Sequence, residues 1–378
     1  MRYTADDHRH MARALQLAAQ GLYTTEPNPR VGCVLVRDGQ VVGEGYHQRA
    51  GEGHAEVNAL AVAGEQARGA TAYVTLEPCS HHGKTGPCCE ALAEAGIAKV
   101  ISAMQDPNPQ VSGRGHRYLQ QAGAEVSWGL MQPQAEAINP GFISRMARKR
   151  PFVRIKQAVS LDGRTAMASG ESKWITGAQA RSDVQRLRAR SSAILTGIGT
   201  VLADDPAMTL RAEQLGLENA EEVVRRQPLR LVLDSQLRTP ADAVILQQPG
   251  ETVLVYRDAP GDRVQALQDK ATLLQRDTSD LAGLLEWLAS ERECNELLVE
   301  AGATLSGAVI DAGLADELVL YQATTLLGSN ARAAFELPFD KMAEQRRMEL
   351  LDQRRLGDDL RLTLRFNHSS LNHPAGEQ

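Results

Sequence analysis

The spacing of apolar and polar residues predicts a layered α/β domain in the first third of the chain. A capping pattern at Thr4 predicts the start of a helix, and Gly21 is expected to end it. Two apolar stretches, 31–36 and 41–46, flank the turn residues 37–40, which predicts a β-hairpin. The remaining patterns predict helices over 55–63 and 88–95 and strands over 72–76 and 100–104.

A second α/β domain is predicted after the basic segment 139–151, which we interpret as a solvated linker. Strands alternate with helical patterns beyond it, which predicts an open sheet covered by helices. We therefore expect domains at 1–147 and 148–366, followed by a frayed tail at 367–378. The predicted strands lie at 152–159, 193–196, 229–233, 252–256, 296–300 and 317–321, and an antiparallel hairpin pairs 348–351 with 360–366.

The composition of the chain limits the kinds of molecule that the protein is expected to bind. A length of 378 residues with 43% hydrophobic content fits about two domains with buried cores. A net charge of −6 and an aromatic content of 4% argue against a surface for nucleic acid. No apolar run approaches the roughly 20 residues of a membrane span, and we find no signal-peptide pattern. We expect a cytoplasmic homo-oligomer that binds a small molecule, not a nucleic acid or a membrane.

The cysteines point to metal chemistry. Cys79, Cys88 and Cys89 lie close together in the sequence, whereas Cys33 and Cys294 stand in apolar runs and are expected to be buried. A catalytic zinc ion needs three protein ligands and one open position for water. His54, Cys79 and Cys88 meet that count, because each falls at the end of a predicted element where the three can converge at one edge of the sheet.

Glu56 is the candidate proton shuttle of this predicted site. It follows His54 by two residues, so its carboxylate can reach a zinc-activated water without binding the metal. These groups favour hydrolytic deamination of an amidine-like carbon in a pyrimidine ring.

Other interpretations of the same residues stay open. A structural zinc site would take a fourth ligand, for which Cys89, His81 or His82 are candidates. Two alternative functions are a nucleic-acid base deaminase with an appended domain and a non-catalytic zinc interaction module.

The motifs of this first part resemble a known family. PNPRVGCVLV (27–36), GYH (45–47), GEGHAEVNAL (51–60) and TLEPCSHHGKTGPC (75–88) are similar to the deaminase half of the bifunctional riboflavin-biosynthesis deaminase/reductase family. The resemblance implies a cytidine-deaminase-like α/β/α domain in which His54, Cys79 and Cys88 bind zinc and Glu56 donates the proton. It also implies substrate contacts at Asn28, His47, His81 and Lys84.

The second part has two glycine turns where a nucleotide could bind. No GxGxxG follows a strand, so the Rossmann fingerprint is missing. Instead, a strand leads into glycines at 193–200 and another at 296–307, each followed by a helical pattern whose first amides could bind an anion. Two arginines near these loops would suit a phosphate monoester, and Arg211 is one candidate. Most arginines of the segment 181–191 are equally explained as exposed residues of a helix, and Arg188 is distinguished from them only by the resemblance to the family.

RIKQAVSLDGRTA (154–166), SKWITG (172–177), AILTGIGTVLADDP (193–206), VLDS (232–235) and VEAGATLSGA (299–308) are similar to the reductase half of the same family. The resemblance implies a dihydrofolate-reductase-like α/β domain that uses NADPH. Lys156 and Asp204 are both candidates for polarising or protonating the reduced centre. The implied NADPH contacts are Ala158, Trp174, Thr200, Asp204, Ser235, Gly302, Ala303, Thr304, Leu305, Ser306, Gly307 and Ala308, and the implied substrate contacts are Ser172, Arg188, Met208, Arg211 and Glu300.

Together these features predict a bifunctional enzyme of riboflavin biosynthesis, a hydrolase and an oxidoreductase in one chain. The first domain is expected to use Zn²⁺ to deaminate 2,5-diamino-6-(5-phosphoribosylamino)pyrimidin-4(3H)-one. The second is expected to reduce the ribosyl side chain of the product to ribityl with NADPH.

Overall fold

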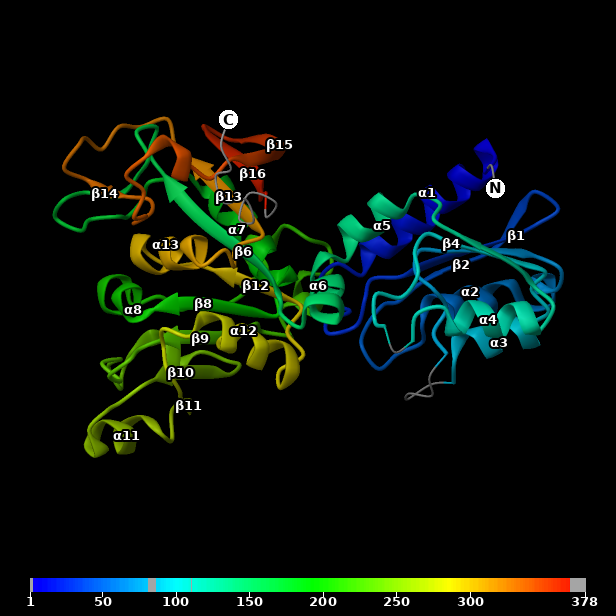
Figure 1. Ribbon diagram of the computed structural model, residues 1–378, viewed down its shortest axis with the longest axis horizontal. Helices are drawn as coiled ribbons and strands as arrows, with labels where there is room; N and C mark the ends of the chain where they lie inside the picture. The colour runs from blue at the N-terminus through cyan, green and yellow to red at the C-terminus, as the bar shows by residue number, and fades with distance from the viewer. Residues whose placement is uncertain (1–2, 81–85, 110, 368–378) are drawn as a thin grey trace, which may run out of the picture. The chain divides into compact units, whose positions relative to one another are not determined.

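The computed structural model describes residues 3–80, 86–109 and 111–367 (Figure 1). The chain divides into two compact units between Arg150 and Pro151, slightly beyond the boundary expected after residue 147. The expected tail lies outside the described residues, apart from Asn367.

A five-stranded sheet forms the centre of the first unit, in the order β2-β1-β3-β4-β5 over the described residues. β1 is antiparallel to β2 and β3, whereas β3, β4 and β5 are parallel. The predicted hairpin is confirmed, and its turn places Asp38 and Gly39 at φ of 52° and 77°. The strands are β1 (Gly32–Arg37), β2 (Gln40–Tyr46), β3 (Thr71–Val74), β4 (Lys99–Ser102) and β5 (Glu125–Trp128).

Helices cover both faces of this sheet, and glycines in the strands let two of them approach closely. A Cβ on Gly32 of β1 would lie 2.0 Å from the Ala14 carbonyl oxygen of α1, and one on Gly45 of β2 would lie 2.5 Å from the Ala55 carbonyl oxygen of α2. Gly45 pairs with Cys33, which points to the opposite face from Gly32. α1 and α2 therefore pack on opposite faces and make an α/β/α unit.

The helices α1, α2 and α3 of this unit begin where the local sequence predicts. Thr4 and Asp7 form the capping box of the first helix. The helices are α1 (Ala5–Gln20), α2 (Ala55–Ala63), α3 (Cys88–Glu94), α4 (Arg114–Gln121), α5 (Gln132–Ile138) and α6 (Pro140–Arg148), with a short 3₁₀ turn η1 (Gly64–Ala67).

The linker interpretation of 139–151 was wrong, because most of this segment is the helix α6. The Asn139 side chain binds the backbone of Arg30 on both sides, accepting from its N–H and donating to its carbonyl, each at 2.8 Å. Arg145 donates to the Pro27 carbonyl. Basic residues on an exposed helix face give the same charge pattern as a linker, so charge could not separate the two.

The second unit has a nine-stranded sheet over the described residues, in the order β11-β10-β9-β8-β12-β6-β13-β16-β15. The strands from β11 to β13 are parallel, and the β15–β16 hairpin is antiparallel, as predicted. The strands are β6 (Phe152–Val159), β8 (Ala193–Gly197), β9 (Leu229–Leu233), β10 (Thr252–Tyr256), β11 (Thr272–Gln275), β12 (Glu296–Val299), β13 (Glu317–Gln322), β15 (Met348–Leu356) and β16 (Asp359–Phe366), beside a separate pair β7 (Arg164–Ala166) and β14 (Arg332–Ala333).

Alternate residues of these strands point to opposite faces of the sheet, where they pack in two separate hydrophobic cores. Leu297 and Val299 of β12 pack in one core with the helices α12 and α13, whereas Leu298 packs in the other with α7 and α11. The helices are α7 (Ala178–Arg190), α8 (Ile198–Asp204), α9 (Ala212–Leu215), α10 (Ala220–Val223), α11 (Gly261–Leu267), α12 (Leu281–Ser290) and α13 (Ala303–Asp311), with 3₁₀ turns η2 (Val244–Gln247) and η3 (Met342–Glu344).

Cys33 and Cys294 are buried in the cores of the two units, as expected. Among the helices of the described residues, none combines the length and apolar character that crossing a bilayer requires.

Candidate functional site

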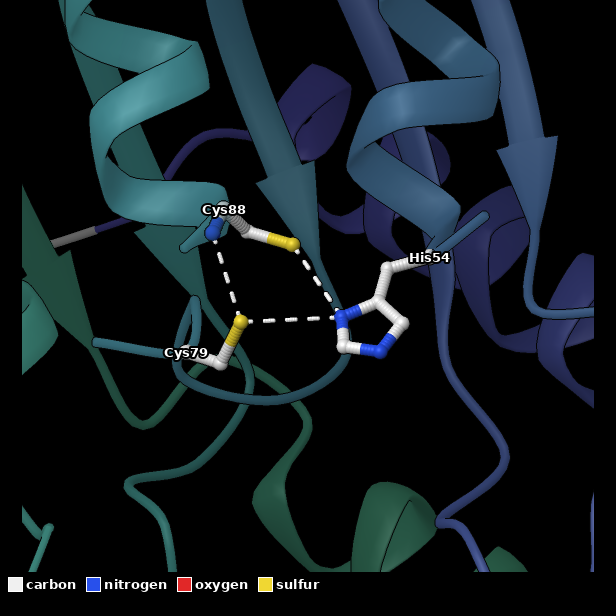
Figure 2. A group of neighbouring side chains, drawn as sticks. All are labelled: His54, Cys79 and Cys88. Atoms are coloured by element: carbon white, nitrogen blue, oxygen red, sulfur yellow. Dashed lines mark hydrogen bonds between the residues drawn. The ribbon is translucent and has the colours of Figure 1, made fainter. Parts of the chain in front are cut away.

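Three predicted metal ligands lie together in the first unit (Figure 2). His54 precedes α2, Cys79 follows β3 in the chain, and Cys88 is the first residue of α3. His54 Nδ1 lies 3.3 Å from Cys88 Sγ and 3.5 Å from Cys79 Sγ. The Cys88 backbone N–H donates to Cys79 Sγ at 3.3 Å. The three donor atoms all lie within 4.8 Å of one another.

These separations fit a tetrahedral zinc ion. Bond lengths of about 2.3 Å to sulfur and about 2.0 Å to nitrogen imply an S···N separation of roughly 3.5 Å at a tetrahedral angle. Within the described part of the chain the group has three donors, and Cys89 is not one of them. That count is typical of catalytic zinc, which keeps one position for water. His81, His82 and Lys84 lie outside the described residues.

Cys79 is prepared to act as a thiolate. Hydrogen bonds from the Cys88 side chain, from His54 and from the Cys88 N–H outweigh the effect of burial and lower the pKa of Cys79 to about 4. A thiolate is the form that binds a metal. The cation and the thiolate would therefore stabilise each other.

Glu56 lies on the first turn of α2 beside this group and is only 3% exposed. Burial and the nearby Cys79 raise the pKa of Glu56 to about 7. A carboxyl group with such a pKa can both accept and release a proton at neutral pH. It is separate from the three donors of the metal group in this part of the structure.

Asn28 and His47 border the same group. The Asn28 side-chain nitrogen lies 3.1 Å from His47 Nε2, and His47 Nδ1 lies 3.1 Å from the Gly53 carbonyl oxygen. The His47 and His54 rings meet edge to face, with centroids 5.2 Å apart. His47 is therefore a buried neighbour of a candidate metal ligand. Burial lowers the pKa of His47 and favours the neutral imidazole.

In the second unit, three predicted residues form a buried ion cluster near the carboxyl end of β12. Arg188 on α7 donates from Nε and Nη2 to the two Glu300 oxygens, at 2.6 and 2.9 Å. Lys156 Nζ on β6 lies 3.7 Å from Glu300. Burial opposes ionisation of Glu300, but these two cations lower the pKa of Glu300 to about 2. The Arg188 guanidinium group therefore binds a carboxylate of the protein itself, whereas the sequence had suggested only a phosphate as its partner.

The two glycine turns fit a nucleotide cofactor. α8 begins at Gly197 and α13 at Gly302, and neither helix has a side-chain cap. A Cβ on Gly199 or Gly302 would meet nothing within 4 Å, so the backbone is open to a ligand at both turns. Helix amides in this position bind phosphate groups.

The predicted 302–308 contact set divides into two parts. Ser306 is fully buried and bonds to Gln157 Nε2 at 2.8 Å, and a Cβ on Gly307 would lie 2.0 Å from the Glu336 carbonyl oxygen. Both positions face the protein. Gly302, Thr304 and Ala308 are exposed, and Ala303 and Leu305 are half-buried.

The other predicted residues of this unit are more scattered. Ser172 Oγ donates to Asp204 on α8 at 3.2 Å, which brings one substrate candidate and one cofactor candidate together. Met208 is buried in the core at a φ of 50°. The remaining candidates are Ala158, half-buried on β6; Thr200 on α8; Trp174, 72% exposed and 4.5 Å from the Arg181 guanidinium; Ser235, bonded to Thr278; and Arg211, exposed at the start of α9.

Two clusters near these groups were missed from the sequence. Glu77, which the sequence analysis includes only within the motif TLEPCSHHGKTGPC (75–88), is buried and accepts several backbone hydrogen bonds. In the second unit, the Tyr321 hydroxyl donates to Asp183 at 2.6 Å, and Arg361 donates to the same carboxylate at 2.9 Å. A glutamate directly before Pro-Cys is a weak signal for the first cluster. The second has none, because its members are far apart in the chain.

The fold and the site define a class of protein: a zinc-binding, cytidine-deaminase-like domain followed by a dihydrofolate-reductase-like domain that depends on NADPH. Residues 4–104 match the family described as the cytidine and deoxycytidylate deaminase zinc-binding region, and residues 151–362 match the RibD C-terminal domain.

The chain belongs to the RibD family of bifunctional riboflavin-biosynthesis enzymes. It is 53% identical to the riboflavin biosynthesis protein RibD of Escherichia coli K12 over 95% of this chain and 99% of the relative. It is 50% identical to RibD of Haemophilus influenzae over 96% of this chain and 98% of the relative.

Two solved structures agree over nearly the whole chain. RibD of Acinetobacter baumannii superposes with a TM-score of 0.89 at 48% identity and covers 96% of this chain and 99% of its own. A deaminase/reductase from Thermotoga maritima superposes with a TM-score of 0.83 at 31% identity, with the same coverage. These relatives confirm the predicted fold class, the two activities and the two cofactors, zinc and NADPH. They favour this enzyme over the nucleic-acid deaminase and the zinc interaction module.

Proposed function

We propose that His54, Cys79 and Cys88 hold the zinc ion of the deaminase and that Glu56 is its proton shuttle. The observation that supports this most strongly is the convergence of the three donor atoms beside one buried carboxylate. When bound, zinc supplies the activation of water for hydrolysis. Glu56 takes up the proton at its carboxylate and passes it to the departing amine, so that ammonia leaves.

The proposed substrate is 2,5-diamino-6-(5-phosphoribosylamino)pyrimidin-4(3H)-one. A relative of known structure is named a diaminohydroxyphosphoribosylaminopyrimidine deaminase, which supports this substrate. Asn28 and the neutral His47 are proposed to bind the pyrimidine, because His47 contacts the candidate ligand His54, Asn28 contacts His47, and both carry hydrogen-bonding atoms. His81 and Lys84 are proposed as further contacts from the sequence alone.

The second unit is proposed to reduce the ribosyl side chain of the deaminated product to ribityl. The turns at Gly197 and Gly302 are proposed to bind NADPH, together with Ala158, Trp174, Thr200, Asp204 and Ser235. Ser172, Met208, Arg211 and the Lys156–Arg188–Glu300 cluster are proposed to bind the substrate. The open backbone at both turns and the concentration of charge near the end of β12 support this division.

Removal of the metal tests the assignment of the two activities. Dialysis against a chelator is expected to abolish ammonia release from the diamino substrate, because no cation then activates water. Oxidation of NADPH with the deaminated substrate is expected to continue at its previous rate. The assay follows ammonia and NADPH together, with and without NADPH, and zinc is then added back. Ammonia release that survives the loss of zinc would contradict the proposal.

The deaminase is proposed to occupy the domain expected at 1–147, which in the structure continues to Arg150, and the reductase the domain expected at 148–366, which begins at Pro151. A cytoplasmic location is also proposed, and it suits the candidate ligands Cys79 and Cys88, whose thiols a reducing compartment keeps from forming disulfides.

We further propose that the chain forms a homo-oligomer. β15 is an edge strand of the described sheet and exposes Leu350 and Leu351 by 53% and 38%. Two adjacent exposed leucines, on an edge strand whose other exposed residues are charged or polar, favour contact with a second copy. Sedimentation velocity is expected to give a mass of at least two 41.0 kDa chains. A mass of one chain at micromolar concentration would contradict the proposal.

A further inference from the structure

Glu77 is a buried carboxylate that binds the start of a helix distant from it in the sequence. Its side chain is almost fully enclosed, with 5% of the residue exposed. Oε2 accepts the backbone N–H groups of Asp106 and Gly113, at 3.1 and 2.9 Å. Oε1 accepts those of Gly115 and His116, at 3.0 and 3.4 Å.

These contacts cap the helix α4. Gly113 is its N-cap residue and has no side chain with which to cap it. The first N–H groups of a helix have no partner within the helix, and a negative charge beside them is favourable. Glu77, from outside α4, supplies both the acceptors and the charge.

The same contacts fix the segment that carries Cys79. Pro78 and Cys79 follow Glu77 directly, and the Pro78 carbonyl lies so close to α4 that a Cβ on Gly115 would be 2.0 Å from its oxygen. α4 in turn packs beside α3, whose first residue is Cys88. The carboxylate therefore joins the segment of one candidate ligand to the helix layer that presents another.

We propose that Glu77 is a positioning residue of the zinc site, which holds Cys79 Sγ at the point where His54 and Cys88 also reach the metal. This inference rests on the ligand set proposed above. A carboxylate suits the task because all four of its partners are donors, so both oxygens must accept. An amide would turn one end into a donor that faces two N–H groups.

Glu77→Gln tests this role with zinc itself as the probe. We expect the affinity for zinc, measured by competition with a chromogenic chelator, to fall by about 10- to 100-fold, as when residues behind metal ligands are replaced. The reductase kcat and KM are expected to stay at wild-type values, which shows that the chain is folded outside the deaminase site.

Asp7→Asn is the matched control, because Asp7 is the capping carboxylate of α1 and lies in the same unit. It is expected to lower the Tm of the deaminase unit and to leave the zinc affinity unchanged. If Glu77→Gln lowers Tm in the same way but binds zinc as tightly as wild type, Glu77 is only structural and the proposal is wrong.

Two further variants separate the possible failures. If Glu77→Gln does not fold, Glu77→Asp is tested in its place, because aspartate keeps two acceptor oxygens on a shorter side chain. Weakened zinc binding by Glu77→Asp supports the proposal, and unchanged zinc binding contradicts it. Cys79→Ser tests the ligand set itself. Zinc affinity that depends on Cys79 but not on Glu77 overturns only this inference, whereas affinity independent of Cys79 overturns the ligand set as well.

Discussion

Glu56→Gln is expected to abolish ammonia release while zinc content and NADPH oxidation stay at wild-type levels. The glutamine has nearly the same shape but cannot take up a proton and return it. Loss of a positioned general acid–base costs about 10²- to 10⁴-fold in rate. The zinc content should not change, because Glu56 is not one of the three donors found in the described residues. Ammonia release, zinc analysis and NADPH oxidation with the deaminated substrate measure the three quantities.

Glu52→Gln is the control for this experiment, since Glu52 lies in the loop before His54 and is exposed. It removes one carboxylate near the site without removing the buried one, and deamination should continue. Normal deamination by Glu56→Gln would refute the shuttle role.

Glu300→Gln is expected to have the opposite effect: the reductase activity is lost and the deaminase activity is retained. The neutral side chain leaves the half-buried Arg188 and Lys156 without their shared, buried anion. Removing one partner of a buried pair costs about 3–5 kcal/mol. If ~3 kcal/mol of this cost is lost from transition-state stabilisation, because the residues of the reductase site are misplaced, kcat/KM falls by about 10²-fold. Steady-state NADPH oxidation by wild type and variant gives the ratio.

Glu296→Gln provides a strict comparison. Glu296 opens the same strand, β12, and its buried carboxylate pairs with Arg154 and Arg190 at 2.8 and 3.0 Å. The cost in thermal stability should be similar for both variants, whereas only Glu300→Gln should reduce kcat/KM strongly. Equal losses of activity in the two variants would mean that the Glu300 cluster is structural and not part of the substrate site.

The sequence predicted those site residues whose positions follow from local structure. His54 and Cys88 stand at the starts of helices, and Cys79 stands after a strand, so the ends of three elements were enough to predict that they meet at one edge of the sheet. The hairpin at 32–46 was equally local, because its turn residues occupy the positive-φ conformations that Asp and Gly tolerate.

The sequence could not predict partners that only the folded chain brings together. Arg188 looked like a phosphate ligand, but its partner Glu300 lies 112 positions away. Glu77 shows the same limit, since the amides that it binds are 29 to 39 residues further along. The strand β11 was missed for another reason: it is a four-residue edge strand with exposed ends, so its apolar signal is short.

The bonds between Asn139 and Arg30 determine where the two activities can be divided by genetic dissection. A fragment ending at Ile138 would retain every strand of the first sheet but would lose the Asn139 side chain that binds the Arg30 amide and carbonyl. We expect this fragment to aggregate more readily than the longer one when it is expressed. A gene split after the codon for Arg150 keeps α6 with the sheet that it braces, so the two catalysts are best separated there.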